Sequence, residues 1–600
     1  MGWVVPLDSL PTKKFMVKVT SENGSISIIA DFYRLSTAVD RPFVSVFDVA
    51  GDPVCELFVP SSIHPLHDRD DTVALGPWHV DATEDEVVLC IEAQSSVWKH
   101  KEYRFHCFAR RFSYEAIVTG SGCLTEANMF GGYYSADLRW GTGFFPSGQH
   151  FLRMFNPEPN VSEEIFFSPA AGSAIDLIGV PLPSRGDWFF TPSPFSFSCA
   201  GPNSWMAMGV AAQAGERQFT ALRYHGERES FYLTLDFEGY TPVSGSYTLP
   251  SISFDFAPIG HDAPAKDPYE ALAAHVQSLQ AQGLVPQPRI RQTPAWWEAP
   301  IFCGWGAQCH LALQAGTSAP DYARQEYYEE FLEVLHREQI RPGTVVLDDK
   351  WQATYGNNEV DTEKWPDLPG FVARQHEAGR RVLLWLKAWD PEGVPVEECM
   401  TNAAGASIAV DPGNPAYERR LRNAVRRMLA PDGYHADGFK IDFTARIPSG
   451  PGIRRYGGTW GLELMKQYLG IIYDEAKRIK PDALIMTHTP HPYLVDVLDM
   501  IRLNDMNTGT DIPRAMEHRA RVARIACPEA IIDTDNWPIS DKGTWRAYLE
   551  LQAELGVPSL YYSSHVDATG EALEAADYDL LRHVWQAYHE RRPQLNEKNQ

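Results

Sequence analysis

The segment Gly438–Phe443 carries a lysine and an aspartate two residues apart, Lys440 and Asp442, in a short apolar run. Residues two apart in a β-strand lie on the same face. An ammonium beside a carboxylate lowers the pKa of the acid, which then stays ionised at neutral pH. An ionised carboxylate is the nucleophile that attack on an electrophilic sugar carbon requires. Asp442 is therefore our candidate nucleophile, although a lone Lys-x-Asp triplet is more often a solvated strand end.

This run is one of eight short apolar segments that alternate with amphipathic helical patterns in the second half of the chain. Such alternation predicts a parallel sheet with helical crossovers. The predicted strands are Ile301–Trp305, Gly343–Asp348, Arg381–Leu386, Gly438–Asp442, Ala483–Thr487, Met500–Asn504, Ala530–Asp533 and Pro558–Tyr562. Eight parallel strands in about 300 residues predict a (β/α)8 TIM barrel.

The predicted strands end in polar or aromatic side chains, and the C-terminal ends of the strands form the active face of a TIM barrel. These residues include Trp305, Asp348–Trp351, Lys387, Trp389, His488, His491, Asp505, Asp533–Trp537 and Ser563–His565. Carboxylates and tryptophans without metal-type clustering favour glycoside hydrolysis. That reaction needs one carboxylate to attack the anomeric carbon and a second carboxyl to protonate the leaving oxygen. Asp505 is the candidate for the second role.

The first half of the chain has short β-rich runs separated by turn residues, which predict an antiparallel β-sandwich. Asn23-Gly24 predicts a tight hairpin, and Tyr103–Phe112 is one of the predicted strands. The glycine-rich connection Gly131–Gln149, which includes Trp140, has the composition of a loop. Asp267-Pro268 predicts the start of a helix that runs to about Gln282.

The change of pattern predicts three parts of the chain: a β-sandwich domain at residues 1–265, a linker helix and linker at 266–295, and the catalytic barrel at 296–600.

A net charge of −25 over 600 residues argues against nucleic acid and anionic membranes as partners. The nine cysteines form no CxxC pair, so they indicate neither a disulfide framework nor a metal site, and we expect no metal and no cofactor. The first residues, Met1–Asp8, lack the pattern of a signal peptide, and no apolar run is long enough to span a membrane. We therefore expect a cytoplasmic protein unless a leader has been removed.

Three motifs together carry a resemblance to a known family. Leu347–Trp351, with the sequence Leu-Asp-Asp-Lys-Trp, Lys440–Asp442 and Asn504-Asp505 stand at the ends of predicted strands two, four and six. This set resembles the α-galactosidase clan of glycoside hydrolases, nearest to family 36 with its Leu-Asp-Asp-Gly-Trp, Lys-x-Asp and Ser-Asp signatures. The similarity covers roughly residues 300–565, and a β-supersandwich ahead of the barrel also fits that family.

The resemblance implies a retaining, exo-acting α-glycosidase that is α-galactosidase-like and acts on an α-linked oligosaccharide or glycoconjugate. Asp442 would be the nucleophile, and Asp505 the general acid and then the general base. The implied sugar contacts are Asp348, Asp349 and Lys440, with Trp305, Trp351 and Trp385 as stacking or wall residues. Homo-oligomerisation is implied by the resemblance alone.

Several residues depart from the family pattern. Lys350 replaces a glycine, Thr444 replaces an asparagine, and Thr487–His491 replaces a Cys-Ser-Gly-Gly-Gly-Arg type segment. The third strand places Lys387 near the pocket. The two lysines indicate either a charged glycoside or solvated lysines at the rim, and we favour the rim interpretation.

Two other loops at the strand ends contribute candidate residues. We interpret His488 as a substrate hydrogen-bonding residue rather than a metal ligand, because no third ligand accompanies His488 and His491. Asp535 and Trp537 are interpreted as pocket wall.

Three alternatives remain open at this stage. A transglycosylase of the raffinose-synthase type would use the same two aspartates with a sugar as acceptor. An α-glucosidase-type specificity would also fit, because Asp348 and Asp349 do not distinguish an axial from an equatorial hydroxyl. A catalytically silent carbohydrate-binding barrel would bind sugar without turnover.

Overall fold

The computed structural model describes residues 17–136, 141–157, 165–177, 194–289, 293–450, 452–503, 505 and 511–598, the last seven as backbone only. Trp140 and Asn504 lie outside the described residues. The described residues form two compact units. The first contains the chain up to Asp176, the part from 194 to Val285, and Trp460–Glu463; the second contains Pro286–Thr459 and the chain from Leu464 onward.

The first unit is built almost entirely of antiparallel strands, which all belong to one hydrogen-bonded network. The strands are β1 Lys18–Glu22, β2 Ser25–Ile29, β3 Arg34–Thr37, β4 Phe43–Phe47, β5 Pro53–Phe58, β6 Ser62–Pro65, β7 Asp71–Ala82, β8 Val87–Ser95, β9 His100–Cys107, β10 Arg111–Met129, β11 Gly131–Tyr134, β12 Gly143–Gln149, β13 Arg153–Phe155, β14 Phe166–Phe167, β15 Ser173–Asp176, β16 Ser196–Ala200, β17 Trp205–Ala211, β18 Ala221–Glu227, β19 Ser230–Thr248 and β20 Ser251–Asp255. The prediction of an antiparallel β unit is confirmed at this level. The strands do not separate into two sheets, because the long strand β10 pairs with β6, β9, β19 and β20 along its length.

The hairpin predicted at Asn23-Gly24 is present: both residues have positive φ, 50° and 83°, and Glu22 pairs with Ser25. Two predictions in this unit are wrong. The run 103–112 is not one strand, because a turn closed by the hydrogen bond from Phe108 N to Arg111 O separates β9 from β10. Part of 131–149 is not a loop, because β11 pairs with β12.

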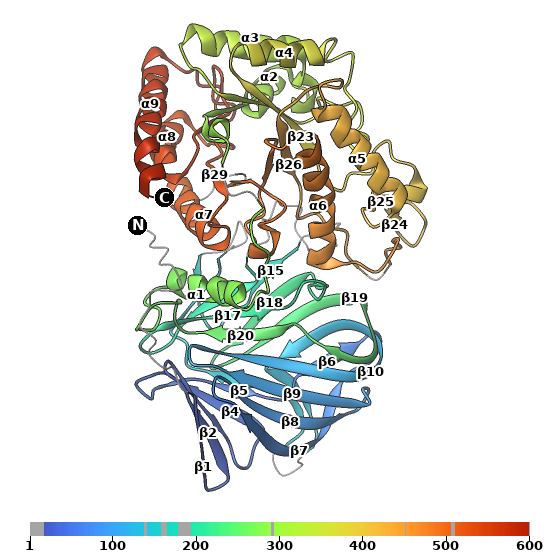
Figure 1. The fold of residues 1–600 in the computed structure, drawn as a ribbon, viewed down its shortest axis with the longest axis vertical. Coiled ribbons are helices and arrows are strands. Elements are labelled where there is room, and N and C mark those ends of the chain that lie inside the picture. The colour runs from blue at the N-terminus through green and yellow to red at the C-terminus, as the bar shows by residue number, and fades with distance from the viewer. Residues whose placement is uncertain are drawn as a thin grey trace. The chain divides into compact units, whose positions relative to one another are not determined.

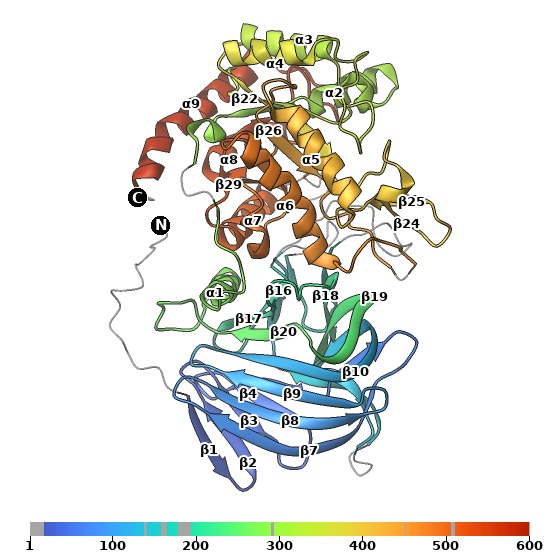
Figure 2. The same ribbon diagram turned by 45° about the vertical axis from the view of Figure 1, so that its right-hand side comes forward.

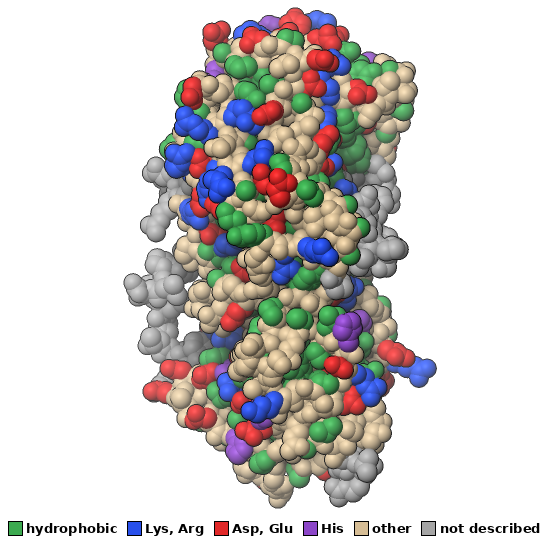
Figure 3. Space-filling view, turned by 90° about the vertical axis from the view of Figure 1, so that its right-hand side faces the viewer, with side chains coloured by type: hydrophobic (Ala, Val, Ile, Leu, Met, Phe, Trp, Pro, Cys, Tyr) green, Lys and Arg blue, Asp and Glu red, His purple; other side chains and the backbone are tan. Residues whose placement is uncertain are grey.

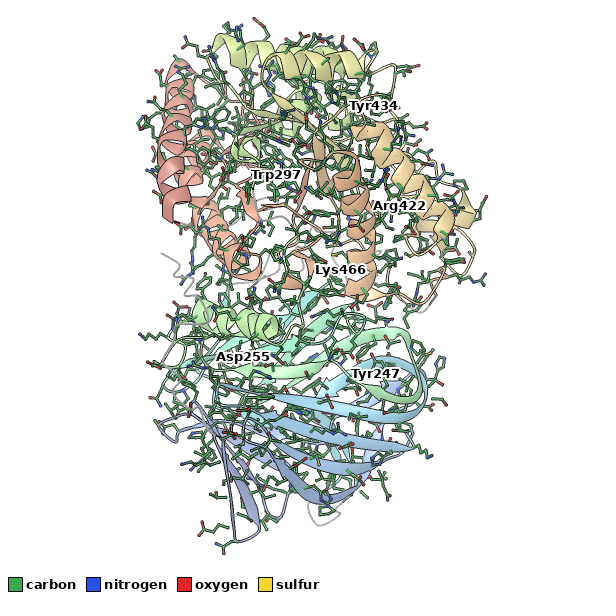
Figure 4. The ribbon with its side chains drawn as sticks, viewed as in Figure 1. Tyr247, Asp255, Trp297, Arg422, Tyr434 and Lys466 are labelled. Atoms are coloured by element: carbon green, nitrogen blue, oxygen red, sulfur yellow. The ribbon has the colours of Figure 1, made fainter. Side chains whose placement is uncertain are left out.

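The helix predicted from Asp267 is α1, Pro268–Ala281, whose first turn is capped by the Asp267 carboxylate. It packs on β16, β17 and β20. His275 on this helix hydrogen-bonds Asp255 on β20 at 2.9 Å, and both side chains are buried (Figure 4). The helix therefore belongs to the core of the β unit.

The second unit contains a parallel sheet of eight strands that follow one another in chain order around the sheet. The strands are β21 Ile301–Cys303, β22 Thr344–Leu347, β23 Arg381–Lys387, β26 Gly438–Asp442, β27 Leu484–Thr487, β28 Met500–Arg502, β29 Ile531–Asp533 and β30 Ser559–Leu560. All eight predicted strands are confirmed, within a few residues at each end. β21 pairs with β30, and a parallel bridge between Asp533 and Val557 links β29 to the start of β30, so the barrel is nearly closed.

Helices surround this sheet, and Figures 1 and 2 show α5 and α6 outside β23 and β26. The helices are α2 Trp305–Ala315, α3 Gln325–Arg337, α4 Leu368–Glu377, α5 Pro415–Leu429, α6 Gly461–Ile479, α7 Ile512–Ala526, α8 Lys542–Leu555 and α9 Ala575–Lys598. A small hairpin, β24 Cys399–Thr401 with β25 Ser407–Val410, is inserted after β23. The 3-10 turns among the described residues of this unit are η2 Ala295–Glu298, η3 Ala319–Tyr322, η4 Val396–Glu398 and η5 Pro492–Leu494. Side chains of Asp or Asn cap α4, α5, α7 and α8, which explains where these helices begin. Arg422 on α5, which is labelled in Figure 4, lies 3.6 Å from Glu475 of α6.

Two buried aspartates brace the entry ends of the barrel strands in the same way. Asp437, just before β26, accepts from the backbone N–H of Val382 at 2.8 Å and from Lys480, the residue after α6, at 2.7 Å. Asp499, just before β28, accepts from Ile485 N and from Lys477, each at 2.8 Å. Each carboxylate thus connects its own strand to the backbone of a neighbouring strand and to a lysine at the C-terminal end of α6 or just after it.

No helix among the described residues is long and apolar enough to cross a membrane. The face of the molecule in Figure 3 carries acidic and basic side chains intermingled, without a continuous basic area on that face.

Candidate active site

Asp442, the last residue of β26, lies among donors contributed by three other barrel strands or their ends. Its Oδ1 accepts from Arg502 at 2.9 Å and from its neighbour Phe443 N at 3.0 Å. Its Oδ2 accepts from Trp385 Nε1 at 3.1 Å. His488 Nε2 lies 3.5 Å from Oδ1. The carboxylate is held in one orientation by these contacts.

Arg502, at the end of β28, connects Asp442 to Asp505. One guanidinium nitrogen donates to Asp442, and the other donates to Asp505 at 2.7 Å and to Asp535 at 2.5 Å. The arginine side chain is only 2% exposed, and its positive charge pairs with three carboxyl groups in the barrel interior. A buried arginine needs such partners, because an unpaired buried charge is strongly destabilising. The two candidate catalytic aspartates therefore lie on the two arms of one guanidinium.

The environments of these two aspartates shift their pKa values in opposite directions. Burial by itself would raise the pKa of Asp442, but the positive charge of Arg502 outweighs it and brings this pKa to about 2. Burial raises the pKa of Asp505 to about 6, against the opposing charge of Arg502. Between these values Asp442 is ionised and Asp505 is protonated. A pair of carboxyl groups separated in this way can serve as nucleophile and acid.

Lys440 and Asp348 form a buried ion pair at 2.7 Å. The same ammonium also donates to Tyr561 Oη at 3.2 Å and lies 3.5 Å from Cys303 Sγ. An ammonium has three donors, and these three partners match them in number. Asp348 accepts from Cys303 Sγ on one oxygen and from Asp349 N on the other. Lys440 and Asp348 thus form a buried ion pair at the site, and their contacts with a sugar stay a prediction.

Asp349 is more accessible than Asp348. Its Oδ1 accepts from Tyr355 Oη at 2.7 Å. Burial raises the pKa of Asp349 to about 6, and the hydrogen bond from Tyr355 opposes this. Of the two adjacent aspartates, Asp349 is the one that keeps exposed surface, and its contact with a substrate hydroxyl stays a prediction.

The four predicted tryptophans separate into two pairs. Trp385 and Trp351 are fully buried, and Trp351 Nε1 donates to Trp385 O at 2.8 Å. Trp351 also makes an edge contact with Tyr434, which is labelled in Figure 4. Neither ring has a free face for a sugar: Trp385 orients Asp442, and Trp351 supports Trp385.

Trp305 and Trp537 form the second pair. They are half-buried and meet edge to face at 5.8 Å between ring centroids. Trp305 is the first residue of α2 rather than the end of a strand. These two indoles keep the exposed surface that a pocket wall requires.

His488 is buried behind Asp442, and burial lowers its pKa to about 3, so the imidazole is neutral. Its Nε2 is 3.2 Å from Thr444 Oγ1. His491 instead accepts from Tyr493 N. Asp535 is also buried and binds Arg502, so it supports the carboxylate cluster. Within the described part of the chain, no group of three or more metal-binding side chains occurs.

Left-handed backbone accumulates at this face of the barrel. Lys350, Trp389, Phe443 and Asp535 follow β22, β23, β26 and β29 and have φ of 75°, 67°, 59° and 56°. Non-glycine residues rarely adopt such angles, and they cluster at functional sites. Four strand ends at this face thus have a backbone conformation of the kind that occurs at functional sites.

Sequence reasoning missed Arg502, Tyr355 and Cys303. Arg502 had a usable signal, since it lies inside a run of apolar residues that must be buried, and buried arginines are almost always paired. Tyr355 lies in a loop, and no spacing rule connects it to Asp349. Cys303 looked like one of several scattered cysteines.

The fold and site together define a two-unit protein with carboxylates at the C-terminal face of a parallel β/α barrel. No family model matches the sequence. A search of curated proteins finds no significant match.

Solved structures, in contrast, match over nearly the whole chain. A GH31 family sulfoquinovosidase from E. rectale, solved with an aza-sugar inhibitor, aligns with a TM-score of 0.60 at 12% identity, over 96% of this chain and 83% of that one. A GH31 dextranase from Flavobacterium johnsoniae, solved with glucose, aligns with a TM-score of 0.53 at 10% identity, over 97% and 69%. An α-galactosidase from Thermus thermophilus aligns with a TM-score of 0.48 at 14% identity, over 79% and 97%.

At these identities the likeness establishes the fold, which this chain shares with multidomain glycoside hydrolases. Family 36 as the nearest relative is not supported, because the structures with the higher TM-scores are described as GH31 enzymes. The α-galactosidase alignment is too weak to favour its family or its substrate.

Proposed function

We propose that this protein is a retaining glycoside hydrolase that removes terminal α-linked sugars with Asp442 and Asp505. The observation that carries the proposal is the shared guanidinium of Arg502, which holds two carboxyl groups whose pKa values are about 2 and about 6. The likeness of the fold to glycosidases supports the same class of reaction.

In the first step the ionised Asp442 attacks the anomeric carbon, and the protonated Asp505 gives its proton to the glycosidic oxygen as that bond breaks. The aglycone leaves as an alcohol, and the sugar remains esterified to Asp442. In the second step the Asp505 carboxylate takes a proton from water, which attacks the anomeric carbon and releases Asp442. Two inversions give net retention of the anomeric configuration.

The other residues of the site have supporting roles in this scheme. Trp385 and Arg502 fix Asp442 by hydrogen bonds to its two oxygens. Asp349 accepts a hydroxyl of the non-reducing sugar. Trp305 and Trp537 form an apolar wall suited to the faces of sugar rings. Substitution of each of these residues by itself tests its role.

The motif resemblance alone favours an α-galactoside as substrate, and a panel of substrates identifies the sugar. Hydrolysis of a panel of aryl α- and β-glycosides, followed by proton NMR of the first-formed product, tests the class of reaction. We expect an α-glycoside to release the α-anomer first. Release of the β-anomer would contradict a double displacement, and turnover of β-glycosides alone would contradict the α-specificity.

A further inference from the structure

Lys350 and Lys387 place two ammonium groups on one tyrosine ring beside the proposed active site. Their Nζ atoms lie 3.7 and 4.1 Å from the centroid of the Tyr355 ring. The lysine side chains are only 20% and 24% exposed. They are therefore not the freely solvated rim residues that the sequence favoured.

The backbone at Lys350 indicates that a lysine is kept there at a cost. Its φ is +75°, a conformation that suits glycine and strains residues with a Cβ atom. The motif that this segment resembles has glycine at this position. Strain of this kind persists where the side chain serves a function.

Both ammonium groups retain donors for a ligand. Lys350 pairs with Glu392 at 2.5 Å, and Lys387 pairs with Asp390 at 2.8 Å. Each ammonium has three donors, and one of them is used in each pair among the described contacts. Glu392 is 44% exposed, and an ion pair with an exposed partner is easily exchanged for another anion.

The lysines are also close to the reacting groups. Lys387 is the register partner of Asp442 in the parallel pair β23 and β26. It is near enough to Asp349 for its charge to act on that carboxyl group. A sugar that binds Asp349 and reacts at Asp442 therefore lies within reach of Lys387.

We propose that Lys350 and Lys387 bind an anionic substituent on the non-reducing sugar of the substrate. The substituent is a carboxylate, sulfonate, sulfate or phosphate, all of which accept hydrogen bonds from ammonium groups. This inference rests on the proposed function, because it names the substrate class of the same site. Asp349, Asp390 and Glu392 face the same two lysines, and Arg446, which lies 4.3 Å from the centroid of the Phe443 ring, adds a further cation nearby.

The test compares kcat/KM for matched aryl α-glycosides: a neutral glucoside, a glucuronide, a 6-phosphate and a 6-sulfonate. The proteins are the wild type, Lys387→Met, Lys350→Gly and, as a control, Lys266→Met, which removes an exposed lysine of the β unit. We expect the wild type to prefer one of the anionic glycosides at least tenfold. We expect each site variant to reduce the ratio of anionic to neutral kcat/KM at least tenfold, and the control to leave it unchanged. The three anions distinguish the chemistry of the substituent.

A wild type that prefers the neutral glycoside, or site variants with an unchanged ratio, would overturn this inference and leave the glycosidase proposal intact. If no glycoside is hydrolysed, the proposed function fails, and calorimetric titration then tests the inference by itself. Tighter binding of glucuronate, glucose 6-phosphate or the sulfonated sugar than of glucose, lost in Lys387→Met, would support it. Equal or absent binding of all four sugars would overturn it.

Discussion

Asp442 and Asp505 bind opposite nitrogens of the same guanidinium, at 2.9 and 2.7 Å. Asp442 ends β26 and Asp505 follows β28, two strands that β27 separates in the sheet, and the two residues are sixty-three positions apart in the chain (505 − 442 = 63). Arg502 therefore couples the position and the ionisation of both carboxyl groups, and a change at any one of the three residues is expected to affect the other two.

Replacement of Asp442 by glycine is expected to reduce turnover of an aryl α-glycoside by a factor on the order of 10³ or more, because no carboxylate remains to attack the anomeric carbon. Azide fits the space of the missing carboxylate and should restore turnover with a β-configured glycosyl azide as product. Mass spectrometry and NMR of the product check this. An α-configured azide, or a variant with near wild-type activity, would rule out Asp442 as the nucleophile.

The pH dependence should reflect Asp505. Its pKa of about 6 means that activity falls as the pH rises through about 6 and the acid loses its proton, whereas Asp442 stays ionised down to about pH 2. We therefore expect a pH–kcat/KM profile with its maximum below pH 6.

The pKa of Asp349 is also about 6, so the profile needs a control. A dinitrophenyl glycoside has a leaving group that needs no protonation. If Asp505 causes the fall, this substrate should show no loss of kcat/KM between pH 5 and 8. A fall that persists with this substrate would show that a group other than the general acid causes it.

Replacement of Arg502 by methionine leaves three carboxylates without their buried cation. We expect a loss of about 3–5 kcal/mol in the free energy of unfolding at pH 7.5. The carboxylates of the variant should have folded-state pKa values above those of the unfolded chain, so the loss should shrink as the pH falls through those values. Urea denaturation at pH 7.5 and pH 5 measures both effects.

Arg289→Met is the matched control, because the ion pair of Arg289 with Asp474 is about half exposed. Its loss should cost at most about 1 kcal/mol. A cost for Arg502→Met no larger than that of this control would show that Arg502 does not hold the cluster together.

At position 350, glycine should be more stable than alanine. Both substitutions remove the ion pair with Glu392, but only alanine keeps the Cβ strain at φ +75°. We expect a difference of about 1 kcal/mol in thermal unfolding. The same two substitutions at Lys387, the last residue of β23, should give the reverse order. Equal stability of the two variants at position 350 would argue against strain there.

The barrel could be predicted from the sequence because its strands are buried on both faces and therefore appear as short, uniformly apolar runs. Gly438–Asp442 was predicted residue for residue. The antiparallel unit was harder to predict. The composition of two half-buried strands can continue through the turn between them, as at Phe108, so the turn is missed. Glycines that allow a close approach between strands have the composition of a loop, as in β11 and β12.

The candidate site was predictable in its acidic residues and less so in its supporting ones. Asp442 ends a strand, and Asp349 and Asp505 follow strands, where the barrel geometry makes them converge. Whether an indole is buried depends on packing from distant segments, so Trp351 and Trp385 could not be separated from Trp305 and Trp537 by sequence. The ion pairs of Lys440 with Asp348 and of Arg502 with Asp442 join side chains that are more than fifty residues apart in the chain.

Asp437 precedes β26 and Asp442 ends it, so one short strand carries a structural brace at one end and the proposed nucleophile at the other, about 16 Å apart. The braces at Asp437 and Asp499 stabilise the barrel without using the residues at its opposite rim. Side chains at the rim are thus free to diverge while the scaffold stays folded. Directed evolution of new substrate specificity should therefore randomise positions such as Lys350, Tyr355 and Lys387 and leave Asp437 and Asp499 untouched.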